Sequence, residues 1–224
     1  IIARSPGRCP STSVAQMSHF DTEAATPGGF DMSYAEVELL VTGRGRVAVP
    51  ALSNDIILLF TDGEEPAPRF GAKAFVGTHP TFREIGLVVN LEASGGSGAS
   101  LLAETSGPED WLIQHLAAAD SHPAAFSFIT EVTQLVGGFG PDFDAFNDAG
   151  TAGMHFAYLH GSPIYHTAAD NIGAVNLGSL QHHGNHSIAI ARQFGAIDLL
   201  DLPVAQNATY FTIRPFFFQY GGGW

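Results

Sequence analysis

Two short motifs place histidine and carboxylate side chains close together along the chain. His19 is followed two residues later by Asp21, whose carboxylate could accept the second ring N–H of a metal-binding histidine. Glu64 and Glu65 are adjacent, and because their charges repel, a nearby cation would relieve the pair. One of them could bind a metal while the other serves as general base toward a metal-bound water. Taken singly, the first motif is more often a structural histidine, and the second is as readily a solvated acidic turn.

Further along the chain, Glu92 ends an apolar run, and Tyr165 and His166 stand in a polar loop. Together the two histidines and three carboxylates supply the ligand types of a pair of zinc ions roughly 3.5 to 4 Å apart, with one carboxylate bridging them. The bridging residue should come from the stretch between the two motifs, where Asp31 and Asp55 are the candidates. Asp31 is preferred because it precedes a predicted helix, from which it can reach the site.

The composition narrows the class of protein. The chain has 224 residues, 45% of them hydrophobic and 14% charged, which suits a single domain with a large core. Its formal charge of −13 would repel nucleic acid and anionic lipid, so neither is an expected partner. Cys9 is the one cysteine, which excludes an intrachain disulfide and a zinc site built of several thiolates. No run of about 18 apolar residues is present, so no membrane span is expected within these residues.

The apolar pattern predicts the elements that position the candidate side chains. Short β-rich runs alternate with longer amphipathic stretches, which is typical of an α/β fold with a mostly parallel, mixed central sheet flanked by helices. The candidate residues then lie at the carboxyl ends of predicted strands, where sites form in open α/β sheets. Strands are expected at residues 13–19, 55–60, 85–91 and 154–159, and helices at residues 34–41, 108–119, 124–135 and 180–194.

Three other segments are expected to have structural roles. His182 and His186 have the spacing of neighbours on one helix face, but no Glu general base accompanies them as in metalloprotease helices, so we expect a scaffold helix. The glycine-rich stretch 95–98 lacks the lysine of a phosphate-binding loop and is expected to form a turn. The aromatic tail over residues 210–224 could be a packed edge strand or the approach to a further segment.

Taken in order, the motifs resemble a known enzyme family. The chain contains His-x-Asp, a Pro-Gly loop with an Asp, an apolar strand followed by Asp-Gly-Glu-Glu, then Asn-Leu-Glu-Ala-x-Gly and Tyr-His-Thr-x-x-Asp. This order is similar to that of the co-catalytic two-zinc aminopeptidases of the bacterial leucyl aminopeptidase type. The resemblance covers about residues 14–197 and is strongest to the membrane-tethered, endoplasmic-reticulum-metallopeptidase-like subgroup. It implies a single zinc peptidase catalytic domain over residues 1–224 with a three-layer α/β/α fold.

The resemblance also implies roles for individual residues. Glu64 would be the general base toward a metal-bridging water, Asp21 would orient a histidine ligand, and Tyr165 would hydrogen-bond the oxyanion. The implied reaction is hydrolysis of the N-terminal peptide bond of a peptide with a free N-terminus. The implied compartment is extracytoplasmic: secreted, periplasmic or membrane-tethered. One zinc ion would be held by His19, Asp31 and Glu92, and the other by Asp31, Glu65 and His166.

Two alternatives to an aminopeptidase stay open at the level of sequence. A glutaminyl cyclase resembles this fold but uses a single zinc ion for aminoacyl transfer within one substrate, and the presence of both His19 and Asp31 argues against it. A catalytically inactive binding domain on the same scaffold is supported only by the residue after Asp31, which is Met32 rather than the usual Asp or Asn. The number of zinc ions per chain separates the three.

Overall fold

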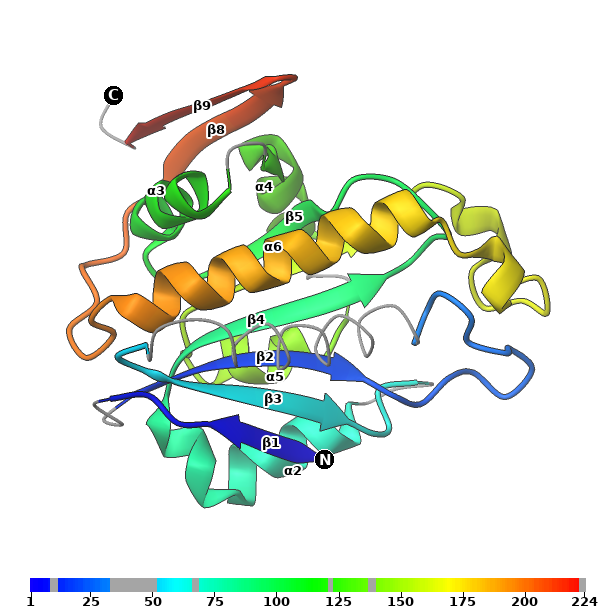
Figure 1. Cartoon of the computed structure of the whole chain (residues 1–224), viewed down its shortest axis with the longest axis horizontal. Helices are drawn as coiled ribbons and strands as arrows, with labels where there is room; N and C mark the ends of the chain where they lie inside the picture. Colours follow the sequence, from blue (N-terminus) through cyan, green and yellow to red (C-terminus); the bar gives the residue numbers. More distant parts are fainter. Residues whose placement is uncertain (9–11, 33–51, 66–68, 121–122, 137–139, 222–224) are drawn as a thin grey trace.

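A seven-stranded mixed sheet forms the centre of the computed structural model, which describes residues 1–8, 12–32, 52–65, 69–120, 123–136 and 140–221. The strand order is β1-β3-β2-β4-β7-β5-β6 (Figure 1). The run from β3 through β2 and β4 to β7 is parallel, whereas β1 is antiparallel to β3 and β5 is antiparallel to β7. The strands are β1 (Ile2–Ser5), β2 (Ser13–His19), β3 (Asp55–Thr61), β4 (Ile85–Ala93), β5 (Leu101–Ser106), β6 (Ala124–Ala125) and β7 (Gly153–Tyr158).

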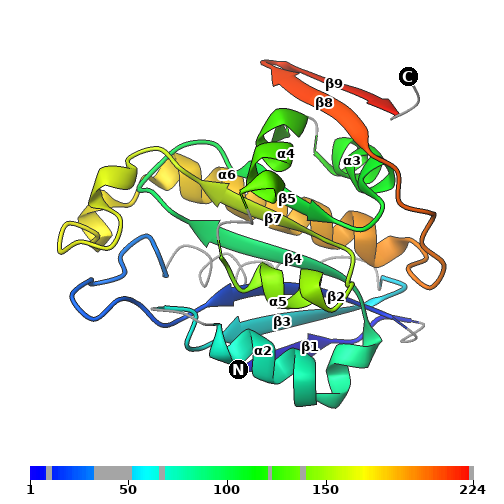
Figure 2. The same ribbon diagram turned by 180° about the vertical axis from the view of Figure 1, so that it is seen from behind.

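Helices cover both faces of this sheet and give three layers (Figures 1 and 2). One face packs against α3 and α6, and the opposite face packs against α2 and α5. The helices are α2 (Phe70–Thr78), α3 (Glu109–Ala119), α4 (Ser127–Leu135), α5 (Phe143–Asp148) and α6 (Leu177–Ala196), with short 3-10 turns η1 (Pro80–Glu84), η2 (Ser162–Ile164) and η3 (Ile172–Ala174). No helix in the described ranges is long and apolar enough to cross a membrane.

The two central strands β2 and β3 are buried along their whole length, as the continuous apolar run of β3 predicts for a strand covered on both faces; β2 is buried although it carries the polar residues Gln16 and Ser18. Successive side chains of a strand point to opposite faces. Accordingly, Val14 packs in the cluster that contains α3 and α6, whereas Ala15 and Met17 pack in the cluster that contains α2 and α5. The sheet is therefore held rigidly between two apolar layers, and its strand ends are a firm support for a site.

The mostly parallel sheet flanked by helices is confirmed. The four predicted strands are β2, β3, β4 and β7, with ends that differ by at most two residues, and the helices predicted at 108–119 and 180–194 are α3 and α6. The helix predicted at 34–41 lies outside the described residues. The helix predicted at 124–135 is wrong at its start, because Ala124 and Ala125 pair with β5 as strand β6 and α4 begins only at Ser127.

The aromatic tail is not an edge strand of the main sheet. Its strands β8 (Ala208–Ile213) and β9 (Phe216–Gly221) form an antiparallel hairpin of their own, seen beside α3 and α4 at the top of Figure 1. The inner face of the hairpin is anchored by Tyr210, which is 1% exposed and donates a hydrogen bond to Glu109 over 3.0 Å. The hairpin is thus a separate small sheet that packs on the helices, and Phe211 of β8 makes an isolated antiparallel bridge to Phe126, next to β6 at the edge of the main sheet.

Candidate metal centre

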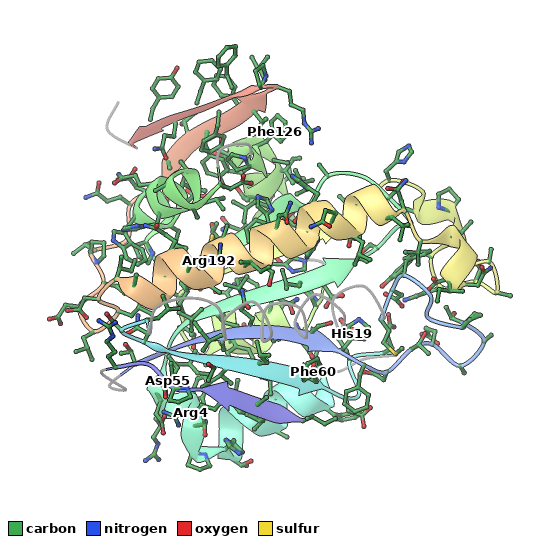
Figure 3. The ribbon with its side chains drawn as sticks, in the orientation of Figure 1. Arg4, His19, Asp55, Phe60, Phe126 and Arg192 are labelled. Atoms are coloured by element: carbon green, nitrogen blue, oxygen red, sulfur yellow. The ribbon has the colours of Figure 1, made fainter. Side chains whose placement is uncertain are left out.

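The candidate site lies at the edge where the parallel strands β2, β3 and β4 end. His19 is the last residue of β2, Glu92 is the penultimate residue of β4, and the acidic pair Glu64 and Glu65 follows the end of β3. In Figure 3, His19 lies at this edge, whereas Asp55 lies near the opposite end of the strands, where it pairs with an arginine of β1. Asp55 is therefore too far from the candidate ligands to bridge them.

A first group of ligand-type atoms forms around His19, which is 1% exposed. Its Nε2 lies 3.2 Å from Oε2 of Glu92, and its Nδ1 lies 2.9 Å from the backbone carbonyl oxygen of Asp21. Burial alone would lower the pKa of His19, but Glu92 and Asp21 outweigh it and hold that pKa well above its usual range. The position of Nε2 therefore favours a positive charge, which a metal ion can supply as well as a proton.

The carboxylate of Asp21 lies farther from the histidine ring than its carbonyl does, with Oδ1 at 3.7 Å from Nδ1 of His19. It accepts hydrogen bonds from the backbone N–H groups of Glu64 at 3.2 Å and Glu65 at 2.9 Å. Burial would raise the pKa of Asp21, but its contact with His19 and these two N–H groups lower it overall. Asp21 thus ties the loop after β2 to the acidic pair after β3 and orients both.

A second group forms around His166. Its Nε2 contacts Oε1 of Glu65, and the hydroxyl of Tyr165 donates to the same oxygen over 3.2 Å. Glu23 joins this group, because one ligand atom each of Glu23, Glu65 and His166 lies within 4.8 Å of the others. The backbone of His166 has a φ of 57°, in the left-handed region that costs a non-glycine residue about 1 kcal/mol or more. Such strain is found where the surrounding structure fixes a functional side chain.

Asp31 connects the two groups. One of its carboxylate oxygens lies within 4.8 Å of ligand atoms of His19 and Glu92, and its Oδ2 is 3.5 Å from Nε2 of His166. Asp31 is 1% exposed, and neither of its carboxylate oxygens accepts a hydrogen bond from the residues that the structure describes. Burial, followed by the nearby charges of Glu92 and Glu65, raises the pKa of Asp31 to about 8. A buried carboxylate without compensation is costly, so this position fits a bound cation.

Glu64 lies at the same edge of the sheet, and its pKa is raised, as is that of Asp31. Burial raises its pKa to about 9, with a further contribution from the charge of Glu92. Divalent cations among these carboxylates would oppose both causes, because positive charge favours the ionised form of a neighbouring acid. The donor set of histidine nitrogens and carboxylate oxygens is one that zinc accepts.

Further residues of the site were not among those singled out from the sequence. Asp170 is fully buried and accepts from the backbone N–H of Phe30 over 2.7 Å, next to Asp31. The spacing Tyr-His-Thr-x-x-Asp contained this residue, so a signal for it existed. Glu23, in the second group, had no such signal because it follows the first motif in a polar loop. Asp142 is also buried nearby, and burial raises its pKa to about 6.

The three-layer α/β fold and the histidine and carboxylate side chains at its strand ends together point to a metal-dependent enzyme. Within that class the chain belongs to peptidase family M28, whose family model matches residues 1–191. The similarity predicted from the order of the motifs is thereby confirmed.

Curated relatives extend the comparison. The chain is 30% identical over 187 residues to endoplasmic reticulum metallopeptidase 1 of Rattus norvegicus, covering 81% of this chain and 20% of the relative. It is 28% identical over 209 residues to a vacuolar membrane protease of Candida dubliniensis, covering 90% of this chain and 21% of the relative. The chain thus spans about a fifth of the length of these relatives.

Solved structures of low sequence identity share the fold. A zinc aminopeptidase from Bacillus subtilis superposes with a TM-score of 0.68 at 19% identity, covering 90% of this chain and 51% of that one. An aminopeptidase from Aneurinibacillus sp. strain AM-1 gives 0.72 at 16% identity, covering 91% and 50%. A glutaminyl cyclase from an Acidobacteriales bacterium gives 0.62 at 18% identity, covering 87% and 72%. The scaffold is therefore shared by aminopeptidases and cyclases.

Proposed function

We propose that this chain is the catalytic domain of an aminopeptidase that hydrolyses the N-terminal peptide bond of peptides with a free N-terminus, using two zinc ions. The observation that carries the proposal is the position of Asp31, which is buried, accepts no hydrogen bond and lies against ligand atoms of both groups. A carboxylate in that place can bridge two cations, whereas a single-ion site has no use for a second group of ligands. The names of the aminopeptidase structures with the same fold support the reaction class.

In this proposal His19, Asp31 and Glu92 hold one zinc ion, and Asp31, Glu65 and His166 hold the other. When bound, the two ions activate the attacking water and polarise the scissile carbonyl. The backbone carbonyl of Asp21 receives the ring N–H of His19 over 2.9 Å and so leaves Nε2 as the coordinating nitrogen.

The proton transfers fall to the chain's own side chains. Glu64 accepts a proton from the water and passes it to the leaving amine, so it has to be ionised before the reaction begins. Burial and the charge of Glu92 raise its pKa, and bound cations would lower that pKa and favour the ionised form. Tyr165, whose hydroxyl now donates to Glu65 over 3.2 Å, turns that donor toward the oxyanion of the substrate.

The proposal is tested by metal content together with activity. Elemental analysis after dialysis against zinc should find at least the two zinc ions of the strand-end site per chain, and an aminoacyl anilide with a free amino group should be cleaved while its N-acetylated form is not. Glu64→Gln should keep both ions and lose activity by about a hundredfold or more, because it removes the proton acceptor and keeps the shape. Glu131→Gln, at an exposed position of α4, is the matched control.

Other results would contradict the proposal. One zinc ion at the strand-end ligands, with cyclisation of an N-terminal glutamine in place of hydrolysis, would favour a glutaminyl cyclase, whose fold is also similar. Two ions without any hydrolysis would favour an inactive binding domain.

The relatives are named for the endoplasmic reticulum and the vacuolar membrane, which supports an extracytoplasmic or membrane-associated location.

A further inference from the structure

A third set of ligand-type side chains lies between helices α3 and α6, apart from the residues assigned to the strand-end site. Asp120, His182 and His186 each offer one ligand atom, and the three atoms lie within 4.8 Å of one another. His182 and His186 are one turn apart on α6, so their side chains project from the same face of the helix. Asp120 is the residue that ends α3, where its backbone N–H bonds to the carbonyl of Leu116. These three residues are called the α3–α6 cluster below.

His186 is the observation that points to a ligand. It is 1% exposed, its Nε2 forms an ion pair with Oδ2 of Asp120, and its Nδ1 makes no hydrogen bond within the part of the chain that the structure describes. Buried polar atoms are almost always hydrogen-bonded, because leaving one without a partner sacrifices its hydration. A metal ion held by the ring of His186 and the carboxylate of Asp120 would take the place of the proton that this pair otherwise shares.

The charge of the surroundings also favours a cation. Asp120 follows the carboxyl end of an 11-residue helix, where the carbonyl groups of the last turn carry partial negative charge. Its carboxylate adds a full negative charge at the same point. The side chain of Asp120 is 19% exposed, which leaves a route for an ion from solvent.

His182 is the third possible ligand of the cluster, but its ring already makes a hydrogen bond. Its Nδ1 accepts a hydrogen bond from the backbone N–H of Ser100 over 3.0 Å, which holds the ring in place. Coordination by His182 would break that hydrogen bond. An ion at Nδ1 would occupy the lone pair that accepts the bond, and an ion at Nε2 would require the ring proton to be on Nδ1, which then could no longer accept. His186 and Asp120 are therefore the primary ligands, and removing His182 should weaken binding less than removing either of them.

We propose that the α3–α6 cluster binds one divalent transition-metal ion, with zinc or cobalt as suitable ions for two imidazoles and a carboxylate. Because its ligands come from two helices that pack side by side (Figure 1), the ion would be a structural clamp between α3 and α6. An ion that binds only the folded chain raises its melting temperature with increasing concentration.

The test compares stoichiometries, so it does not depend on how many ions the strand-end site holds. Equilibrium dialysis against zinc followed by elemental analysis should find one ion fewer per chain in Asp120→Asn and in His186→Gln than in the wild type. Zinc should also raise the melting temperature of the wild type more than that of either variant. His160→Gln is the control, since this exposed histidine bonds Ser97 and belongs to no such group.

Asp120→Asn keeps the test decisive if His186→Gln fails to fold, because the substitution is isosteric and lies at a partly exposed helix end. Equal zinc content in the wild type and Asp120→Asn would overturn the proposal. A loss of one ion in His160→Gln as well would also overturn it, by showing that the extra zinc binds surface histidines. Loss of aminopeptidase activity is not a readout of this experiment, and the aminopeptidase proposal can fail without affecting it.

Discussion

The burial of Glu104 predicts a pH-dependent change in the free energy of unfolding. It lies within strand β5, is 3% exposed, and its Oε2 accepts no hydrogen bond. Burial, followed by the charge of Asp144, raises its pKa from 4.5 to about 7. Each pKa unit corresponds to about 1.36 kcal/mol, so this rise amounts to about 3 kcal/mol. Because the folded-state pKa is the higher one, the associated stability is fully present below about pH 4.5 and is lost as the pH rises through about 7.

Glu104→Gln keeps the shape of the side chain and removes its ionisation. The free energy of unfolding, measured by urea titration in the presence of a chelator, should favour the variant by about 3 kcal/mol more at pH 8 than at pH 4.5. The chelator matters because bound metal would add its own stabilisation. Glu131→Gln on the exposed side of α4 is the control and should show no such pH dependence. A difference between wild type and Glu104→Gln that stays constant from pH 4.5 to pH 8 would refute the reasoning.

Two further predictions concern the metal centre. Asp31→Asn should reduce the zinc content by one or two ions per chain relative to the wild type, with an unchanged circular dichroism spectrum, because the isosteric amide cannot bridge two cations; a zinc content equal to that of the wild type would rule out the bridge. Gly29→Ala should weaken zinc binding in a chelator competition without altering any ligand, because its Cβ would lie 2.1 Å from the carbonyl carbon of Asn171 and would push apart the loops that carry Asp31 and His166. Gly77→Ala is its control, since a Cβ there meets nothing within 4 Å, and equal zinc affinity in the two variants would contradict the argument.

Much of the scaffold could be predicted from sequence because its central strands are short runs rich in apolar residues. Strand β3 is an almost continuous apolar run, whereas β2 and β4 also contain buried polar residues such as Gln16 and Asn90. Strand β5 was not predicted, because it carries Glu104, Thr105 and Ser106 at positions that tertiary packing buries. The two-residue strand β6 was assigned to a helix, since alanines favour a helix locally and only the ladder with β5 decides otherwise.

The positions of the candidate ligands could be predicted to the level of the sheet edge and no further. Parallel strands end at the same edge, so His19 and Glu92 had to lie near one another. The distances among loop residues depend on contacts between segments far apart in the chain, such as the bond from Phe30 to Asp170. Sequence spacing carries no information on such contacts, and for that reason Glu23 was not anticipated in the second group.

The candidate ligands on strands and those on loops are held in different ways, and this difference affects how the centre forms. His19 and Glu92 belong to strands whose backbone hydrogen bonds and apolar packing fix them whether or not an ion is present. Asp31 and His166 come from two loops, and these loops are held by the contact between the two side chains. Asp170 also joins the loops, because its oxygens accept hydrogen bonds from the backbone N–H groups just before Asp31. Folding of the sheet therefore creates half of the centre in advance, and in the proposed two-ion site the binding of ions would help to offset the free energy of ordering the loops.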